Sequence, residues 1–199
     1  MKNINKILFS FLFVFAFMAV DSSVFAQTNA DISPTRKRAI DSLALEKVKD
    51  LSRYITIIGS KSTQYSEAMR VIDRAMELFS DGAQMGVSSV SSKAIRYYGV
   101  RKYFDRLMAL NYDQVTIDWF NIQYISDLEL QPDGRYVGVI TIFQRFQGKS
   151  ADGLVQYSDV TKKDITVYVE RKKTIIAGRE IGFWDVMLGD VRVSETKRN

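Results

Sequence analysis

The sequence predicts an α+β fold in which three helices pack on a curved antiparallel sheet of four long strands. In the C-terminal half, apolar-rich runs alternate between two faces, as strands do, and turn-like polar segments separate them. In the N-terminal half, apolar residues instead recur at intervals of three and four, the spacing of one-faced helices. The four predicted strands are Tyr112–Ser126, Arg135–Gln147, Lys163–Lys172 and Ile181–Val193.

The first 26 residues have the organisation of a cleaved secretory signal. Lys2 and Lys6 precede the apolar run Ile7–Val20, and Val24-Phe25-Ala26 offers small residues at the two positions that a signal peptidase reads. The 14 residues of the run are fewer than the roughly 20 that span a bilayer. This length weighs against the alternative, an uncleaved N-terminal anchor.

Cleavage would leave residues 27–199 as the mature chain, with a polar tether at 27–33 and a single domain at 34–199. No cysteine follows the apolar run, which excludes a lipoprotein anchor. We therefore expect export through the inner membrane to the periplasm or the medium, with no stable membrane anchor after cleavage.

The composition excludes several kinds of active site. The 199 residues include no cysteine and no histidine, which removes disulfides, thiol nucleophiles, Cys/His zinc sites and Ser-His-Asp triads. No EF-hand spacing occurs, so neither a metal nor another cofactor is expected. The net charge is +5. Basic clusters such as Arg36-Lys37-Arg38 and Arg171-Lys172-Lys173 indicate solvated faces, with contact to anionic lipid or polysaccharide as the alternative.

The first helix is expected over residues 34–58, with Ser33 as its N-cap and Gly59 as its end. Thr63 is the expected N-cap of a second helix that ends near Gly82. Because few residues separate the two helices, they should form an antiparallel hairpin. A short strand, Ala83–Ser92, and a third helix, Tyr98–Leu110, are expected to follow.

Glycine and proline mark the turns and bends of the predicted sheet. Pro132-Asp133-Gly134 and Ala177-Gly178 predict turns between strands, and Gly189 indicates a bulge within the last strand. Asp152-Gly153 and Tyr157-Ser158-Asp159 are assigned to a connecting segment, where such residues serve turn chemistry.

Three of the four long strands are apolar on both faces, although three helices cover only one face of a sheet. Large exposed apolar patches are uncommon on monomers, so a homodimer through the outer sheet face is expected. Strands of this length also exceed the usual five or six residues, so the sheet should twist and curl around the helices into a cone.

The order helix, helix, short strand, helix, then four long antiparallel strands resembles the nuclear-transport-factor-2-like superfamily. This cone-shaped α+β family includes ketosteroid isomerase and polyketide cyclases. Runs such as Val155–Thr161 and Trp184–Asp190 also look like those of uncharacterised exported bacterial proteins. The resemblance implies a site in the mouth of the cone, where enzymes of the family use an Asp base and a Tyr or protonated carboxylic acid as oxyanion donor.

The candidate site residues lie on predicted strands from which they could point inward. Asp118, between two apolar residues, is the best candidate base because partial burial would raise its pKa; a solvated position on the strand is the alternative. Gln144 with Arg145 could orient a ligand or form part of a cross-strand polar ladder. The candidate catalytic residues are Asp118, Asp185 and Tyr124, and the candidate ligand-binding residues are Trp119, Gln144, Tyr168 and Trp184.

The function expected from these observations is that of an exported, non-catalytic module. Its cone or outer sheet face would bind a small ligand, an envelope protein or a second copy of the chain, and nucleic acid is not expected because no aromatic–basic motif is present. The absence of histidine and of any catalytic spacing favours this interpretation over an enzyme. The alternative is a small lyase or isomerase that acts on an apolar substrate in the cone, with Asp118 or Asp185 as base.

Overall fold

The computed structural model describes residues 32–124 and 126–198. The predicted signal sequence and most of the predicted tether lie outside the described residues. Ser33–Asn199 is a compact unit. Within the described part of the chain, no helix is both long enough and apolar enough to cross a bilayer.

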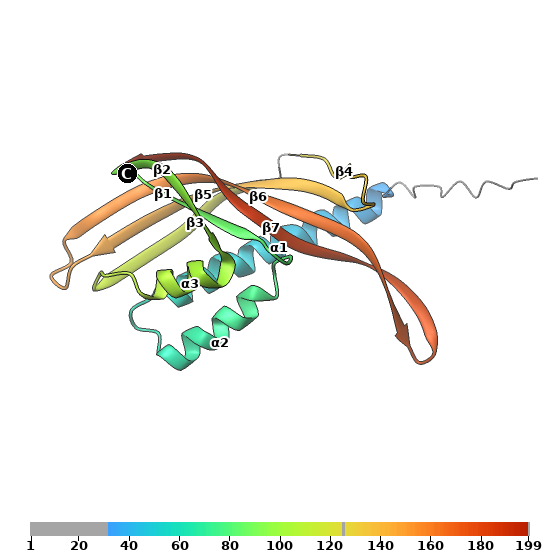
Figure 1. Ribbon diagram of the computed structural model, residues 1–199, viewed down its shortest axis with the longest axis horizontal. Helices are drawn as coiled ribbons and strands as arrows, with labels where there is room; N and C mark the ends of the chain where they lie inside the picture. The colour runs from blue at the N-terminus through green and yellow to red at the C-terminus, as the bar shows by residue number, and fades with distance from the viewer. Residues whose placement is uncertain (1–31, 125, 199) are drawn as a thin grey trace, which may run out of the picture. The chain divides into compact units, whose positions relative to one another are not determined.

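Three helices cover one face of a curved sheet (Figure 1). The first begins and ends as predicted: the backbone N–H of Arg36 donates to the side chain of Ser33, and the helix stops at Gly59. The helices are α1 (Pro34–Gly59), α2 (Tyr65–Met76) and α3 (Val100–Met108).

The second helix is shorter than predicted at both ends. The predicted cap, Thr63, instead donates its hydroxyl to the carbonyl of Ile57, 2.8 Å away, and so closes the loop after α1. The helix begins after Gln64 without a side-chain cap. Beyond Met76 the chain turns toward the sheet, where Phe79 forms an isolated parallel bridge with Leu188.

One sheet contains seven strands in the order β2-β1-β7-β6-β5-β3, and the short β4 pairs with β5. Neighbouring strands are antiparallel, except that β1 meets β7 in parallel. The predicted α+β cone with three helices is therefore confirmed, whereas β2 and the parallel contact were not predicted. The strands are β1 (Gln84–Ser89), β2 (Ser92–Gly99), β3 (Gln114–Tyr124), β4 (Glu129–Leu130), β5 (Tyr136–Lys149), β6 (Val155–Ile176) and β7 (Arg179–Arg198).

The strand β6 is much longer than the predicted strand Lys163–Lys172. Its first half contains Tyr157-Ser158-Asp159, so the assignment of these residues to a connecting segment was wrong. The turn at Asp152-Gly153 does form, with Gly153 at φ 82° and its N–H donating to the carbonyl of Ser150. The first half of β6 lacks the alternation of apolar and polar residues that indicates a strand, because polar side chains occupy its inner face.

The predicted turns and bulge occur where glycine permits them. Gly134 and Gly178 have φ angles of 84° and 75°, and Ala177 beside the latter also has a positive φ, 48°. In β7, Gly189 and its successor lie opposite a single residue of β6, which is a bulge. A Cβ on Gly189 would clash with the ring of Tyr168, so the side chain of Tyr168 occupies the space that glycine leaves open.

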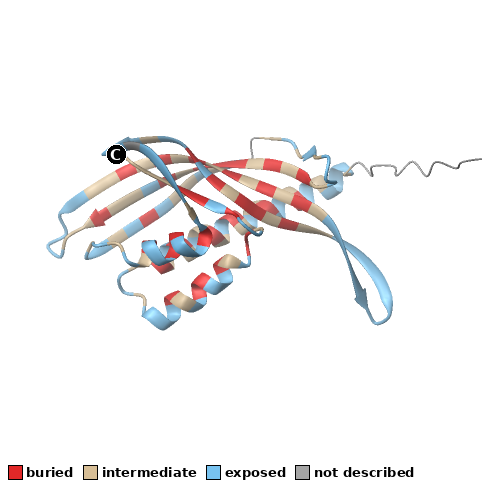
Figure 2. Cartoon of the chain, viewed as in Figure 1, coloured by how far each residue is buried: buried red, intermediate tan, exposed pale blue. Residues whose placement is uncertain are grey.

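The core lies between the helices and the inner face of β5, β6 and β7, where buried residues concentrate (Figure 2). Its largest fully buried side chains come from all of these elements: Leu51, Ile55, Ile72, Phe104, Ile140, Ile142, Ile165 and Leu188. Burying such side chains is the main source of stability in a chain without disulfides.

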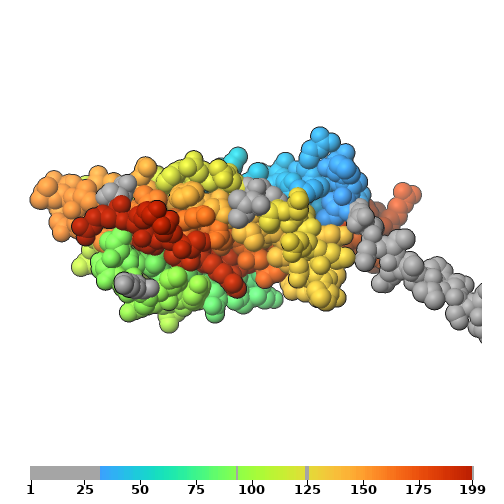
Figure 3. All heavy atoms as spheres, turned by 90° about the horizontal axis from the view of Figure 1, so that it is seen from above, coloured from blue at the N-terminus to red at the C-terminus, as the bar shows by residue number. Residues whose placement is uncertain are grey.

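The outer face of the sheet, seen from above in Figure 3, carries more polar groups than expected. Phe120 and Phe143 stack there with ring centroids 5.7 Å apart. Beside them, Thr141 and Ser194 both donate hydrogen bonds to the carboxylate of Asp164. Polar groups therefore interrupt the apolar surface on which the predicted dimer depends.

Candidate functional site

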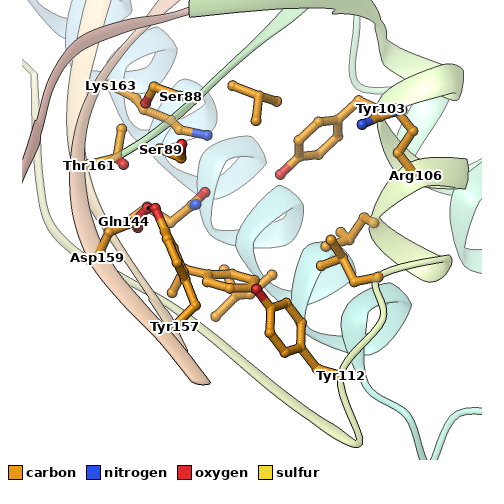
Figure 4. A pocket seen from close by; sticks show the side chains of 15 residues that line it. Ser88, Ser89, Tyr103, Arg106, Tyr112, Gln144, Tyr157, Asp159, Thr161 and Lys163 are labelled. Atoms are coloured by element: carbon orange, nitrogen blue, oxygen red, sulfur yellow. Dashed lines mark hydrogen bonds between the residues drawn. The ribbon is translucent and has the colours of Figure 1, made fainter. Parts of the chain in front are cut away.

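A cavity of about 260 Å³ lies between α3 and the inner face of the sheet (Figure 4). This volume is at the small end of ligand sites in proteins. One wall is apolar, and a set of polar side chains faces it. The apolar wall includes Val87, Leu107, Leu110, Ile117 and Phe146, and the polar set includes Tyr103, Arg106, Gln144, Tyr157, Asp159 and Lys163.

The first half of β6 supplies the polar floor of this cavity. Successive side chains of a strand point to opposite faces, so Asp159, Thr161 and Lys163 share the inner face, about 6.6 Å apart along the strand. On the neighbouring β5, Gln144 pairs with Thr161 in register. The same face of β6 continues into the apolar core from Ile165 onward. The cavity therefore begins where the inner face changes from apolar to polar.

Asp159 is a buried carboxylate with one oxygen available. Its side chain is 4% exposed, and Oδ2 accepts a hydrogen bond from the hydroxyl of Tyr157 at 2.6 Å. Among the described residues, Oδ1 has no hydrogen-bond partner. Burial raises the pKa of Asp159, while the Tyr157 hydrogen bond and the charge of Lys163 oppose that shift.

The hydroxyl of Tyr157 is fixed on both sides. It donates to Asp159 and accepts the backbone N–H of Val90 at 3.0 Å. Burial, and then the neighbouring carboxylate of Asp159, raise the pKa of Tyr157 to about 12. The phenol therefore stays protonated at neutral pH and holds the carboxylate in one orientation.

Lys163 is a buried amine without a hydrogen bond or ion pair to the described residues. Its side chain is 3% exposed, and Nζ lies 5.8 Å from the ring centroid of Tyr103, within the range of a cation–π contact. Burial lowers the pKa of Lys163 from 10.5 to about 8, and the charge of Asp159 offsets only part of this shift.

Two more polar groups lie near the amine. The Oε1 atom of Gln144 accepts a hydrogen bond from Trp119 Nε1 at 3.1 Å, so the amide N–H groups of Gln144 remain for the cavity. Opposite, Tyr103 on α3 directs its hydroxyl toward the same space (Figure 4). Burial raises the pKa of Tyr103, which keeps its hydroxyl a donor.

Of the predicted ligand-binding residues, the structure brings one to the cavity. Gln144 lines it, and Trp119 supports Gln144 from β3. Tyr168 is on the outer face, where the guanidinium of Arg135 lies 4.7 Å from its ring centroid. Trp184 packs edge-on against Tyr136, with 5.8 Å between the ring centroids, and does not line the cavity.

The structure does not bring either predicted catalytic aspartate to the cavity. Asp118 is exposed on the outer face, in register with Arg145, because it alternates with the inward-facing Ile117. Asp185 is half-buried, and its Oδ2 is 2.6 Å from Nζ of Lys172. Tyr124 is the last residue of β3, and its side chain lies outside the described residues.

Tyr157, Asp159 and Lys163 were not among the residues predicted for the site. The sequence does contain a pattern that could have identified them. Each lies an even number of residues before Ile165, the first of the apolar residues on the inner face of β6. Because side chains of a strand alternate between two faces, all three should lie on that inner face.

No protein-family model and no curated protein matches this chain. Similar solved structures include one described as "Putative Scytalone Dehydratase" from Novosphingobium aromaticivorans, with 12% identity, a TM-score of 0.40, and coverage of 83% of this chain and 91% of that chain. Another is a hexachlorocyclohexane dehydrochlorinase, with 14% identity, a TM-score of 0.40, and coverage of 81% and 93%.

Two expectations need correction: the non-catalytic module, and the expectation that the protein is not an enzyme. The two similar structures carry the names of enzymes, a dehydratase and a dehydrochlorinase. The absence of histidine was weaker evidence than supposed. A carboxylate whose pKa is raised and an amine whose pKa is lowered can perform acid–base chemistry without it.

Proposed function

We propose that the protein is a lyase or isomerase that removes a proton from carbon in a small, largely apolar carbonyl compound. The observation that carries the proposal is the pairing of a buried carboxylate, Asp159, with a buried amine, Lys163, on one strand face of one cavity. Buried ionisable groups whose pKa values move toward neutrality are characteristic of active sites.

Asp159 is the base in this proposal. Its Oδ1 atom has no hydrogen-bond partner among the described residues, and Oδ2 is held by Tyr157. Burial makes this carboxylate more basic than a solvated one. It would take a proton from the carbon next to the carbonyl, and the electron pair of the broken C–H bond would move toward the carbonyl oxygen. The pair then either shifts a double bond or expels a leaving group from the next carbon.

The negative charge would develop at the other end of the cavity. Lys163, Tyr103 and the amide of Gln144 surround that end. Preorganised donors in a water-poor cavity stabilise developing charge far better than they would in water. The apolar wall around Phe146 favours a substrate whose body is hydrocarbon.

Exchange of carbon-bound hydrogen in D₂O tests this proposal and does not require the natural substrate to be identified. Small cyclic and acyclic ketones are incubated with the protein, and NMR follows the loss of the α-proton signal. We expect Asp159→Asn, which keeps an acceptor for Tyr157, to lower the rate by a factor of about 10² to 10⁴. The matched control is Asp118→Asn, which removes an exposed carboxylate and should leave the rate unchanged.

Two results would contradict the proposal. One is exchange by the wild-type protein that does not exceed that of buffer for any ketone of the panel. The other is an equal loss of rate in the Asp118→Asn and Asp159→Asn variants, because the cavity would then have no special role.

We also propose that the protein is exported after removal of residues 1–26, as in the exported bacterial proteins that parts of the sequence resemble. The basic start, the short apolar run and the small residues before Gln27 support this proposal. N-terminal sequencing of the protein from the periplasm or the medium should start at Gln27. Ala26→Trp should block cleavage and leave the full-length mass, and a wild-type protein that retains Met1 in the cell would contradict export with cleavage.

A homodimer through the outer sheet face is a further proposal. Phe120 and Phe143 stack on the face of the sheet opposite the described helices (Figure 1), and this pair supports the proposal. Analytical ultracentrifugation at micromolar concentration should show a dimer, and Phe143→Asp should shift it to monomer. A wild-type monomer under these conditions would contradict the proposal.

A further inference from the structure

Among the lysines whose side chains the structure describes, Lys163 is unusual because its amine is enclosed. Its Nζ atom faces the cavity (Figure 4). Its neighbour Lys162 lies on the opposite face of β6 and is part-exposed. No hydrogen bond or ion pair to the described residues occupies Nζ of Lys163, and the ring centroid of Tyr103 lies 5.8 Å from it. A buried amine that faces a cavity without a hydrogen bond or ion pair lacks the partners that a structural lysine would have.

The other ionisable groups around the cavity leave this amine free to react. Asp159, Tyr157 and Lys163 belong to β6, Tyr103 and Arg106 come from α3, and Tyr112 follows α3. Asp159 is bound to Tyr157 and affects Lys163 through charge alone. Arg106 is exposed and stacks over Tyr98 at 4.6 Å, away from the amine.

We infer that the amine of Lys163 is a carbonyl-reactive nucleophile that condenses with an aldehyde or ketone in the cavity to form a Schiff base. A lysine desolvated in an apolar pocket has the free electron pair that this reaction needs. The inference deepens the proposed function and rests on it for the step that follows condensation. It names the substrate class as an aldehyde or ketone small enough for about 260 Å³.

The reaction balances without an oxidant or a further reactant. The ammonium first loses a proton to water, and the neutral amine attacks the carbonyl carbon to give a carbinolamine. The new hydroxyl group then takes a proton from the Tyr103 hydroxyl, which lines the same cavity, and leaves as water. This gives an iminium ion and one water molecule, and the proton first released to water returns to the Tyr103 oxygen. In the sum, an ammonium and a carbonyl give an iminium and water, with the charge conserved. When Asp159 removes the α-proton, the electron pair neutralises the iminium and an enamine forms.

Reductive trapping on the full-length protein tests the inference. The protein is incubated with cyclohexanone and sodium cyanoborohydride near pH 8, and peptide mapping by mass spectrometry locates the resulting secondary amines. At this pH the neutral fraction of Lys163 is about a hundred times that of an ordinary lysine. Part of this advantage is lost because a less basic amine is also a weaker nucleophile, so we expect Lys163 to react at least about tenfold faster than Lys162. The α-amino group also reacts at this pH, and the peptide map separates it.

Substitutions of Lys163 and Lys162 show which of the two lysines carries the label. Lys163→Met and Lys163→Arg should lose the cavity label, since neither methionine nor the guanidinium condenses with ketones under these conditions, whereas Lys162→Met should keep it. The trapping rate should rise with pH and level off above about 8, where the amine becomes neutral. Labelling of Lys163 no faster than that of Lys162 in the wild-type protein would overturn the inference, and this comparison needs no variant to fold.

The two proposals fail in different ways. α-Proton exchange that depends on Asp159, together with no label on Lys163, would overturn the Schiff base and leave the proposed function in place. A label on Lys163 without α-proton exchange would leave the Schiff base in place and overturn the proposed function.

Discussion

Replacing Lys163 with methionine should stabilise the protein at neutral pH, because the substitution removes a charge from an apolar environment. The methionine side chain is apolar and about as long, so it can occupy the same space beside Tyr103. Most substitutions of buried residues destabilise a protein, so the sign of this prediction is distinctive.

The magnitude follows from the pKa of the amine. Folding lowers it from 10.5 to about 8, and each unit corresponds to about 1.4 kcal/mol, so the charged amine costs about 3 kcal/mol in the folded state. Methionine also loses the cation–π contact with Tyr103, which reduces the stabilisation by about 0.5 to 2 kcal/mol. The net stabilisation should therefore be about 1 to 3 kcal/mol, or roughly 2 to 4 °C in Tm for each kcal/mol in a domain of this size.

The stabilisation should also depend on pH in a defined window. Between about pH 8 and 10.5 the unfolded chain keeps a proton on Lys163 that the folded chain has released. The free energy of unfolding of the wild-type protein therefore rises as pH increases from about 8 to 10.5. Below about pH 8 the charged Lys163 amine destabilises the folded state to its full extent. Urea denaturation at about pH 7 and about pH 10.5 measures the free energy of unfolding of both proteins, and their difference should nearly vanish at the higher pH.

The control for this experiment is Lys162→Met, which removes a part-exposed charge from the other face of the same strand. Its effect should stay within about 0.5 kcal/mol and should not change across the window. If Lys163→Met were less stable than the wild-type protein at pH 7, or if its effect were the same at both pH values, the amine would have a compensating partner and the reasoning would be refuted.

Other substitutions test the packing and chemistry of the same structure. Gly148→Ala would place a Cβ about 2.5 Å from the ring of Tyr112, so it should destabilise by about 1 to 3 kcal/mol in thermal unfolding; the control is Gly182→Ala, whose Cβ would come no closer than 3.5 Å to the flexible side chain of Arg171. Ala177→Asn should stabilise the β6–β7 turn by about 0.5 to 1 kcal/mol in urea, because asparagine tolerates the φ of 48° better than alanine does, and a loss of stability would contradict this view of the turn. The rate of α-proton exchange should fall as pH drops through the raised pKa of Asp159, since the base is active only when ionised, and a rate that is flat down to the range of solvated aspartates would count against this base.

The sequence by itself determined the class of fold and the positions of several turns and a bulge. Alternating apolar residues predicted the strands, three-and-four spacing predicted the helices, and Gly134, Gly178 and Gly189 marked two turns and a bulge that the structure contains. These features depend on near neighbours in the chain, which is why a local pattern reveals them. The boundaries of α2 and the hairpin of β1 and β2 were not predicted, because contacts with the rest of the fold decide them.

The site was decided by the tertiary structure. Asp118 and Asp159 both occupy polar positions in alternating strands, yet Asp118 faces solvent and Asp159 faces the cavity. Alternation shows that a strand has two faces but does not say which face the helices cover when both carry polar residues. The register of β5 with β6 and the position of α3 determine that choice, and they bring together Tyr103, Gln144 and Lys163 from parts of the chain that no local pattern connects.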